Sequence, residues 1–136
     1  MKFITRDTDY ALRALIFMAR ALRLENKKIV TVEDIVKGEK LPRVFLRRIL
    51  QKLAEKKALY SYKGKAGGFS FYLPPKKISL ADVIIVYQGE IDLTHCFLKG
   101  KICLNRSRCS VRKKIKSINA DVIKKLAGIT IEELSR

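Results

Sequence analysis

Apolar residues near the start of the chain recur at three- and four-residue spacing, which is the period of a helix with one buried face. The arginines of this stretch fall outside the apolar stripe, as they do in a surface helix that packs on a core. We therefore predict a first helix over residues 9–21, capped at its N-terminus by Thr8 or Asp9. The stripe consists of Ala11, Leu12, Leu15, Ile16, Ala19 and Leu22.

Two further helices are predicted close together in the next part of the chain. Thr31 is followed three residues later by Asp34, which is the spacing of a capping box at a helix start. A short helix is expected from there to Gly38. Pro42 suits the first turn of the next helix, which we expect to run to about Lys57.

The longer of these two helices has an apolar stripe on one side and basic residues on the other. A short helix, a turn and a basic helix are typical of a helix-turn-helix, whose second helix enters the major groove of DNA. Arginine near its start matches guanine O6 and N7. An ordinary solvated amphipathic helix is the alternative. The candidate DNA-binding residues of this helix are Arg43, Arg47, Arg48 and Lys52.

The apolar period then changes to two, which indicates strands. Residues 59–63 and 69–73 flank a glycine-rich stretch at 64–68, so we predict a β-hairpin. A hairpin directly after a helix-turn-helix is a wing, and Lys63 and Lys65 near its tip are expected to contact DNA beside the major groove. Turn chemistry alone would also account for the glycines.

The last third of the chain combines a helix, a loop and a long amphipathic segment. Ser79 and Asp82 are expected to open a helix that ends at Gly89, and residues 90–108 lack periodicity and are predicted to form a loop. A narrow apolar stripe then suggests a helix that packs against a partner helix, followed by a short turn capped by Thr130. The stripe consists of Val111, Ile115, Ile118, Val122, Leu126 and Ile129.

The predicted fold is therefore mainly α with a small β-hairpin wing. We expect a winged helix-turn-helix over residues 1–75, and a loop with a long C-terminal helix over residues 76–136. A length of 136 residues is that of one compact domain and excludes a large multidomain enzyme.

The charge balance points to a polyanionic partner. The chain has 30 Lys and Arg against 13 Asp and Glu, a net charge of +17, and such an excess favours binding to double-stranded DNA. A membrane surface is the less favoured alternative, since no apolar run, that of residues 83–87 included, is long enough to span a bilayer. Charge appears early in the first residues, so we expect no export and a cytoplasmic protein.

All three cysteines, Cys96, Cys103 and Cys109, fall within fourteen residues of a strongly basic segment. An odd number of cysteines without an export signal argues against a disulfide framework. Basic surroundings favour thiolates, which are ligands of zinc or of an iron–sulfur cluster. The wide spacing lacks the close pairs of structural zinc sites and favours a cluster. A fourth ligand would then come from His95, Asp9, Asp7 or an exogenous molecule.

A catalytic role for these residues is disfavoured. His95 adjoins Cys96, but neighbouring residues in a loop rarely reach the geometry of a nucleophile and its base, and no third orienting group is evident. We expect no enzyme.

The order of these motifs along the chain resembles the Rrf2 family of winged helix-turn-helix regulators, which includes the IscR and NsrR types. The resemblance covers nearly the whole chain and implies a homodimer with crossing C-terminal helices, a [2Fe–2S] or [4Fe–4S] cluster near the dimer interface, and transcriptional control, usually repression. The matching motifs are residues 9–15 (DYALRAL), 63–69 (KGKAGGF), 79–84 (SLADVI) and the three cysteines.

Residue by residue, the resemblance assigns Cys96, Cys103 and Cys109 as cluster ligands, although the first gap is one residue longer than usual. Asp9 matches the aspartate that the NsrR type donates from the opposite protomer, with helix capping as its alternative role. Arg112 stands where the IscR type has its ligating histidine. An arginine, Arg47, also stands where that type has an acidic residue in the recognition helix, so the operator sequence does not transfer.

The expected function is a dimeric DNA-binding regulator, most often a repressor, that senses redox state, nitric oxide or iron–sulfur supply through a cysteine-ligated cluster. Two alternatives remain open. One is a regulator without a cluster, in which a cysteine acts as a thiol switch or contacts a partner protein. The other is a structural zinc protein.

Overall fold

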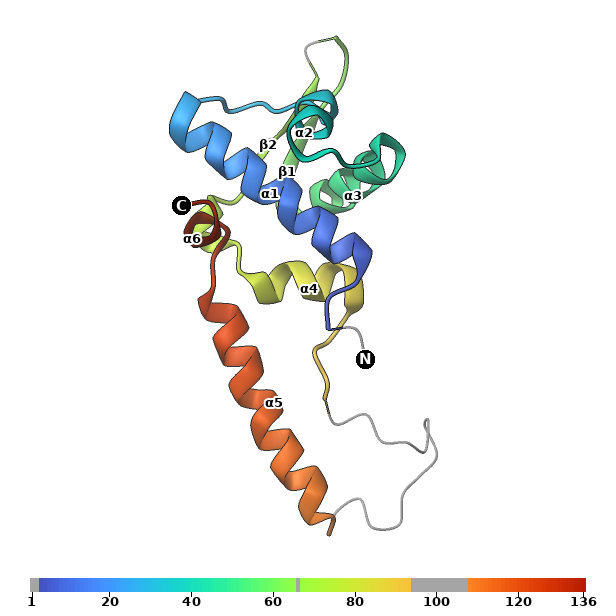
Figure 1. Ribbon diagram of the computed structural model, residues 1–136, viewed down its shortest axis with the longest axis vertical. Helices are drawn as coiled ribbons and strands as arrows, with labels where there is room; N and C mark the ends of the chain where they lie inside the picture. Colours follow the sequence, from blue (N-terminus) through green and yellow to red (C-terminus); the bar gives the residue numbers. More distant parts are fainter. Residues whose placement is uncertain (1–2, 66, 94–107) are drawn as a thin grey trace.

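The computed structural model describes residues 3–65, 67–93 and 108–136, and Figure 1 shows a helical head from which one long helix projects. The head comprises all the helices except that long one, together with the hairpin, and is built around the N-terminal helix. The hairpin lies at the end of the head that is farthest from the long helix. The elements in chain order are α1 (Arg6–Glu25), α2 (Val32–Glu39), α3 (Arg43–Glu55), β1 (Leu59–Tyr62), β2 (Gly68–Phe71), the 3-10 helix η1 (Pro75–Lys77), α4 (Leu80–Gln88), α5 (Ser110–Gly128) and α6 (Ile131–Leu134).

The first helix begins earlier than its apolar stripe indicates. Thr5 caps α1, and its side chain accepts the Thr8 N–H, so the prediction of Thr8 or Asp9 as the cap is wrong. Both residues lie inside the first turn instead. The hydrophobic period locates a buried face, whereas the cap depends on where the chain leaves the helical conformation. At the other end Asn26 adopts the left-handed conformation and closes the helix.

The predicted helix starts at Thr31, Ser79 and Thr130 are confirmed. At Thr31 and Ser79 the hydroxyl accepts the N–H of an aspartate three residues later, and that carboxylate accepts the N–H of the capping residue. The Lys27 ammonium also bonds to Asp34 at 2.8 Å, and this hydrogen bond lowers the pKa of the Asp34 carboxyl. α2 ends at Glu39 with Lys40 in the left-handed conformation, slightly beyond the expected stop at Gly38.

The predicted hairpin is confirmed as a two-stranded antiparallel sheet in which Leu59 pairs with Phe71 and Tyr62 pairs with Gly68. Val30 joins this sheet through two hydrogen bonds to Phe69, of 2.9 and 2.8 Å. A Cβ on Gly68 would approach the Val30 carbonyl oxygen to 2.7 Å, so only glycine permits this close approach. The wing is therefore tied to the segment that leads into α2.

The core of the head lies on the apolar stripe of α1. α2, α3, α4 and α6 all pack against this helix, and its Ala11, Ala14 and Leu15 are fully buried. α6 returns to the head because Ile131 is fully buried, and the carbonyl oxygen of Ser135 accepts hydrogen bonds from Arg20 and Arg23 of α1. The division into residues 1–75 and 76–136 stays a prediction.

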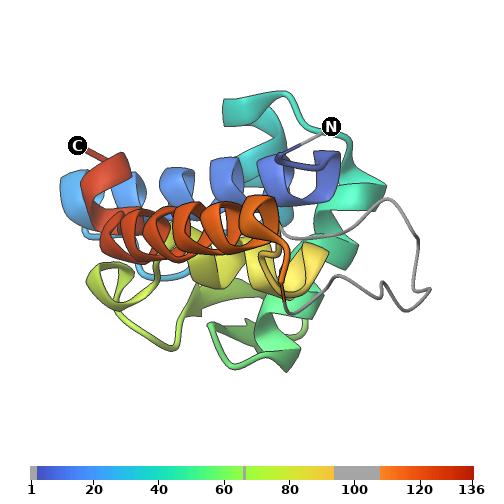
Figure 2. The same cartoon turned by 90° about the horizontal axis from the view of Figure 1, so that it is seen from below.

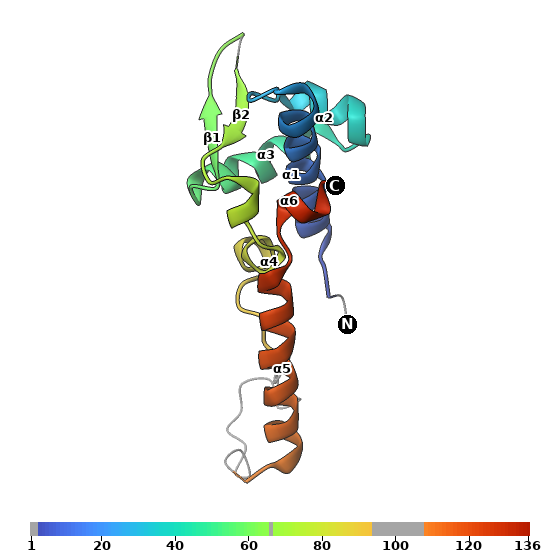
Figure 3. The same cartoon turned by 90° about the vertical axis from the view of Figure 1, so that its left-hand side faces the viewer.

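The long C-terminal helix α5 is confirmed but is poorly covered by its own chain. It extends away from the head in Figures 1 and 3, and seen from below it lies nearest the viewer (Figure 2). Of its predicted stripe only Leu126 is buried, where it packs against Ala81 and Ile84 of α4. Val111 is 68% exposed and Ile118 is 51% exposed. Ile115, Val122 and Ile129 are half-buried, so Val111 and Ile118 are the stripe residues that face outward in a single chain.

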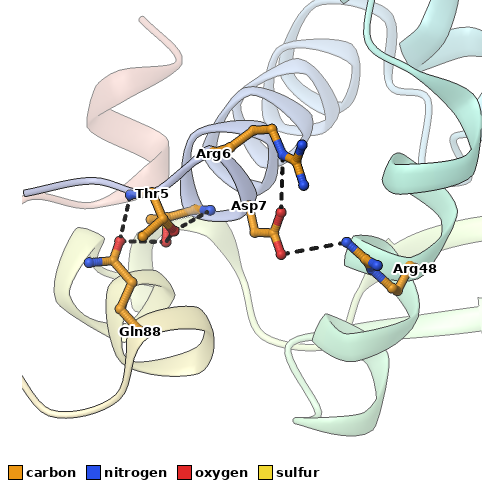
Figure 4. A network of polar contacts seen from close by, with 6 residues as sticks. Thr5, Arg6, Asp7, Arg48 and Gln88 are labelled. Carbon is orange, nitrogen blue, oxygen red and sulfur yellow. Dashed lines mark hydrogen bonds and ion pairs between the residues drawn. The ribbon is translucent and has the colours of Figure 1, made fainter. Parts of the chain in front are cut away.

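The C-terminal end of α4 is attached to both α1 and α3. Tyr87 is half-buried, and its hydroxyl donates a 2.6 Å hydrogen bond to the carbonyl oxygen of Ile49. Burial raises the pKa of this hydroxyl well above its ordinary value of 10.0, and the negative charge of Asp7 raises it further. The next residue, Gln88, accepts the Thr5 N–H at 3.0 Å and the Thr8 hydroxyl at 2.7 Å through one oxygen. Figure 4 shows the contact between Gln88 and Thr5.

We expect Tyr87→Phe to lower the free energy of unfolding by about 1 kcal/mol near neutral pH, because the hydrogen bond to Ile49 is lost. The stabilisation by the hydroxyl is fully present below the ordinary tyrosine pKa and is lost as the pH rises above it, since the unfolded chain ionises first. Urea denaturation between about pH 8 and pH 11 should show a smaller decline for Tyr87→Phe than for wild type. The exposed Tyr72→Phe is the control and should decline as wild type does.

We expect Gln88→Ala to lower the free energy of unfolding by about 1–2 kcal/mol, because the Thr5 N–H and the Thr8 hydroxyl both lose their acceptor. Thr8 is fully buried, so water does not readily replace the lost partner. Urea denaturation measures the change, with Glu90→Ala, an exposed residue two positions further on, as the control. Equal stabilities of the two variants would show that the contacts of Gln88 with Thr5 and Thr8 do not stabilise the fold.

Candidate nucleic-acid interface

The second helix of the helix-turn-helix, α3, has one buried and one exposed face, as the sequence predicts. Leu46, Ile49, Leu50 and Leu53 are buried against the head. The opposite surface carries basic and polar side chains and the exposed Val44, and residues 43–54 contain no acidic residue. An exposed helix face with this charge suits the polyanionic major groove.

Arg43 lies at the first position of α3 and is paired within the protein. Its guanidinium contacts the Glu33 carboxylate at 2.6 Å, in the first turn of α2. Both side chains are about half exposed, so the pair is solvated and contributes little to stability. The contact links the starts of the two helices and holds the guanidinium at the end of α3 where base contacts are expected.

Arg47 is exposed and forms no ion pair within the part of the chain that the structure describes. Lys52 differs from it, because this side chain is half-buried and its ammonium lies 5.2 Å from the centre of the Tyr87 ring. Of these two predicted DNA-binding residues, Arg47 is the one directed to solvent, and Lys52 lies at the junction with α4.

Arg48 belongs to a cluster that periodicity did not indicate. Its guanidinium lies 3.6 Å from Asp7, whose other carboxylate oxygen lies 3.6 Å from Arg6, as Figure 4 shows. The Phe45 ring has Arg6 at 4.5 Å and Arg48 at 5.4 Å from its centre. Arg6 and Asp7 join the interface only through folding, which brings the start of α1 against α3.

The wing lysines Lys63 and Lys65 are exposed on either side of Gly64. Gly64 has a φ of 96°, a conformation that favours glycine, and its carbonyl oxygen accepts the Gly67 N–H at 2.9 Å. The tight turn therefore places both exposed lysines at the tip of the hairpin. Residue 66 lies outside the described residues.

Of the three predicted cluster ligands the structure describes Cys109, whereas Cys96, Cys103 and the neighbouring His95 lie outside the described residues. Cys109 caps α5, and its sulfur accepts the Arg112 N–H at 3.4 Å. Among the described residues, no group of three His, Cys, Asp or Glu side chains is arranged to hold a metal ion.

Asp9 pairs with Arg13 of its own helix at 3.1 Å and is half exposed. It does not cap α1, so the alternative role as a cap is wrong. The first turn of α1 and the start of α5 lie well apart in Figures 1 and 3. Asp9 and Cys109 of one chain are therefore not brought together, and a shared site would need two chains.

No helix in the described residues is long and apolar enough to cross a membrane. Basic residues instead continue along the first half of α5, where Arg112, Lys113, Lys114 and Lys116 follow Arg108. The positive charge from which the sequence predicts a polyanionic partner is thus spread over α3, the wing and the start of α5.

Comparison with known proteins agrees with this geometry. A sequence model of the Rrf2 family, described as iron-dependent transcriptional regulator, matches residues 4–136. A protein of Aquifex aeolicus, provisionally named an HTH-type transcriptional regulator, is 32% identical over 92% of this chain and 85% of its own length. NsrR of Oceanobacillus iheyensis, an HTH-type transcriptional regulator, is 25% identical over 96% of this chain and 88% of its own.

The fold is similar to that of CymR of B. subtilis, a global cysteine regulator, with a TM-score of 0.77 and 20% identity over 99% of this chain and 97% of that one. The predicted winged helix-turn-helix is thereby confirmed, as is the expectation that the chain is no enzyme. The chain belongs to the Rrf2 family of DNA-binding transcriptional regulators.

Proposed function

We propose that this chain is a homodimeric repressor that inserts α3 into the major groove of an operator. We further propose that it senses a signal through the cysteine segment, residues 96–109. The main support for DNA binding is the exposed basic face of α3, since the opposite face of this helix is buried in the core. Arg43, Arg47 and Arg48 are the residues assigned to the groove, and Lys63 and Lys65 of the wing to the flanking backbone.

Exposed apolar side chains on α5 support the homodimer. Val111, Ile118 and Ile123 are large apolar side chains left exposed on this helix, and Ile85 of α4 is exposed as well. Exposed apolar side chains along one helix are typical of a surface that a partner covers. A second copy would supply an identical stripe, and two-fold symmetry would then place two α3 helices on half-sites about one helical turn apart.

The cysteine segment is proposed to hold an iron–sulfur cluster through Cys96, Cys103 and Cys109, with Asp9 of the second copy as the fourth ligand. Cys109 fits such a role, since its sulfur is half-buried at the N-terminus of α5 and accepts a backbone N–H. A bound cluster would supply a redox-sensitive charge in this basic segment. The description of the family as iron-dependent also favours iron over zinc.

The junction at the end of α4 offers a route from the cysteine segment to DNA. Gln88 contacts the start of α1, and Tyr87 contacts α3 directly. A shift at the end of α4 would therefore change how α1 and α3 sit against each other. A coupling of about 1–3 kcal/mol between two sites is typical and is sufficient to release an operator.

We expect Arg47→Ala and Lys65→Ala to affect DNA binding differently. Arg47→Ala should weaken binding to the preferred operator by about 1–3 kcal/mol and relax the base preference at one position, because a base contact is lost. Lys65→Ala should weaken binding to all sequences alike and reduce the salt slope by about 1. Fluorescence anisotropy against the operator and a scrambled duplex, at several salt concentrations, distinguishes the two. Equal behaviour of the variants would contradict the assignment.

We expect the protein purified under nitrogen to be coloured, to contain iron and sulfide, and to lose both colour and operator affinity on exposure to oxygen or nitric oxide. Cys109→Ser should abolish iron binding, whereas Ser110→Ala at the neighbouring position should not. Visible absorbance with iron and sulfide assays provides the measurement. An iron-free protein whose DNA binding responds to peroxide and thiol reductant would favour the thiol switch, and a zinc-loaded protein would favour structural zinc.

A further inference from the structure

Val44, the second residue of α3, is 80% exposed, more than any other large hydrophobic side chain among the described residues. The buried face of α3 is formed by four other apolar side chains, and Val44 lies on the opposite face. An isolated exposed valine on a surface needs no explanation. Its position at the start of the DNA-reading helix is what makes this valine informative.

The neighbours of Val44 define what it can meet. Arg47 and Arg48 lie three and four residues further on and Gln51 lies seven further on, so all share one face of α3, and all are exposed. An apolar protein surface would have to bury both guanidinium groups. Among the described residues Arg47 has no acidic partner, and Arg48 has only the exposed Asp7 carboxylate at 3.6 Å. The charges therefore favour a polyanion on the same face that Val44 occupies.

In the major groove the C5-methyl group of thymine is the apolar group on the base edges, and apolar side chains contact it. Valine in a helix holds one preferred χ1 rotamer, so its methyl groups are already ordered before binding. We infer that Val44 is a specificity-determining residue that packs against a thymine methyl group in each half-site. This inference rests on the proposed insertion of α3 into the major groove.

The expected consequence is a preference for thymine at one operator position, which arises from apolar contact and not from charge or hydrogen bonding. Arg47 and Gln51 would read acceptors and donors, while Val44 would select thymine at one neighbouring position. Removing one buried methyl group from the contact should weaken binding about fourfold per half-site. Such an effect is small beside that of a lost arginine contact, so it requires a test that isolates the methyl group.

The test first identifies the operator by selecting duplexes from a random pool with wild-type protein. Each thymine of the selected operator is then replaced by uracil, which removes the methyl group and keeps the base pairing. Dissociation constants are measured for wild type, Val44→Ala and the control Leu24→Ala. Leu24 is 68% exposed at the opposite end of α1 from the Arg6 cluster and stands in no proposed DNA contact.

We expect one thymine per half-site at which uracil weakens wild type and Leu24→Ala about fourfold, but leaves Val44→Ala unchanged. If the selected operator has no such thymine, or if Val44→Ala remains equally sensitive to uracil, the inference is overturned while the proposed function stands. If no duplex is selected at all, the proposed function itself fails. Circular dichroism confirms that Val44→Ala is folded, as expected for an exposed side chain.

Discussion

The packing of α1 is the constraint on which the rest of the structure depends. Its small residues Ala11 and Ala14 let neighbouring helices approach closely, and Leu15 and Met18 fill the space between them. Since α2, α3, α4 and α6 all rest on this one helix, none can move independently of it. The angle at which α3 presents its basic face is therefore set by contacts on the opposite, apolar side.

In this arrangement the two residues 87 and 88 connect α4 to both α1 and α3. Tyr87 reaches the backbone of α3 and Gln88 reaches the backbone and side chains of the first turn of α1. Both residues lie in the last turn of α4, a few residues before the cysteine-containing segment at residues 96–109. Under the proposed function, a change in that segment would act on neighbouring atoms of both helices and would not need to pass through the core.

The local features of the fold were predictable from sequence because they depend on nearby residues. The capping boxes at Thr31 and Ser79 are set by residues three positions apart, and the hairpin by alternation around its glycines. The Asp7–Arg48 and Gln88–Thr8 contacts join residues far apart in the chain, and no period or motif encodes them. Val44 was missed for another reason, since an apolar residue in an amphipathic helix is expected on the buried side. The roles of Cys96, Cys103 and Asp9 stay predictions.

The acidic residues near α3 explain how so basic a surface can remain selective. Asp7 and Glu33 contact Arg48 and Arg43, so two of the three arginines already have a partner before DNA arrives. Both pairs are exposed, and exposed pairs are worth about 0–1 kcal/mol, so a phosphate or a base can replace the carboxylate at little cost. Because these arginines exchange one anion for another, their net gain on random DNA is small. The wing lysines should therefore dominate the salt-dependent affinity for any sequence, while Arg43 and Arg48 would contribute mainly where the groove offers better geometry than the carboxylates do.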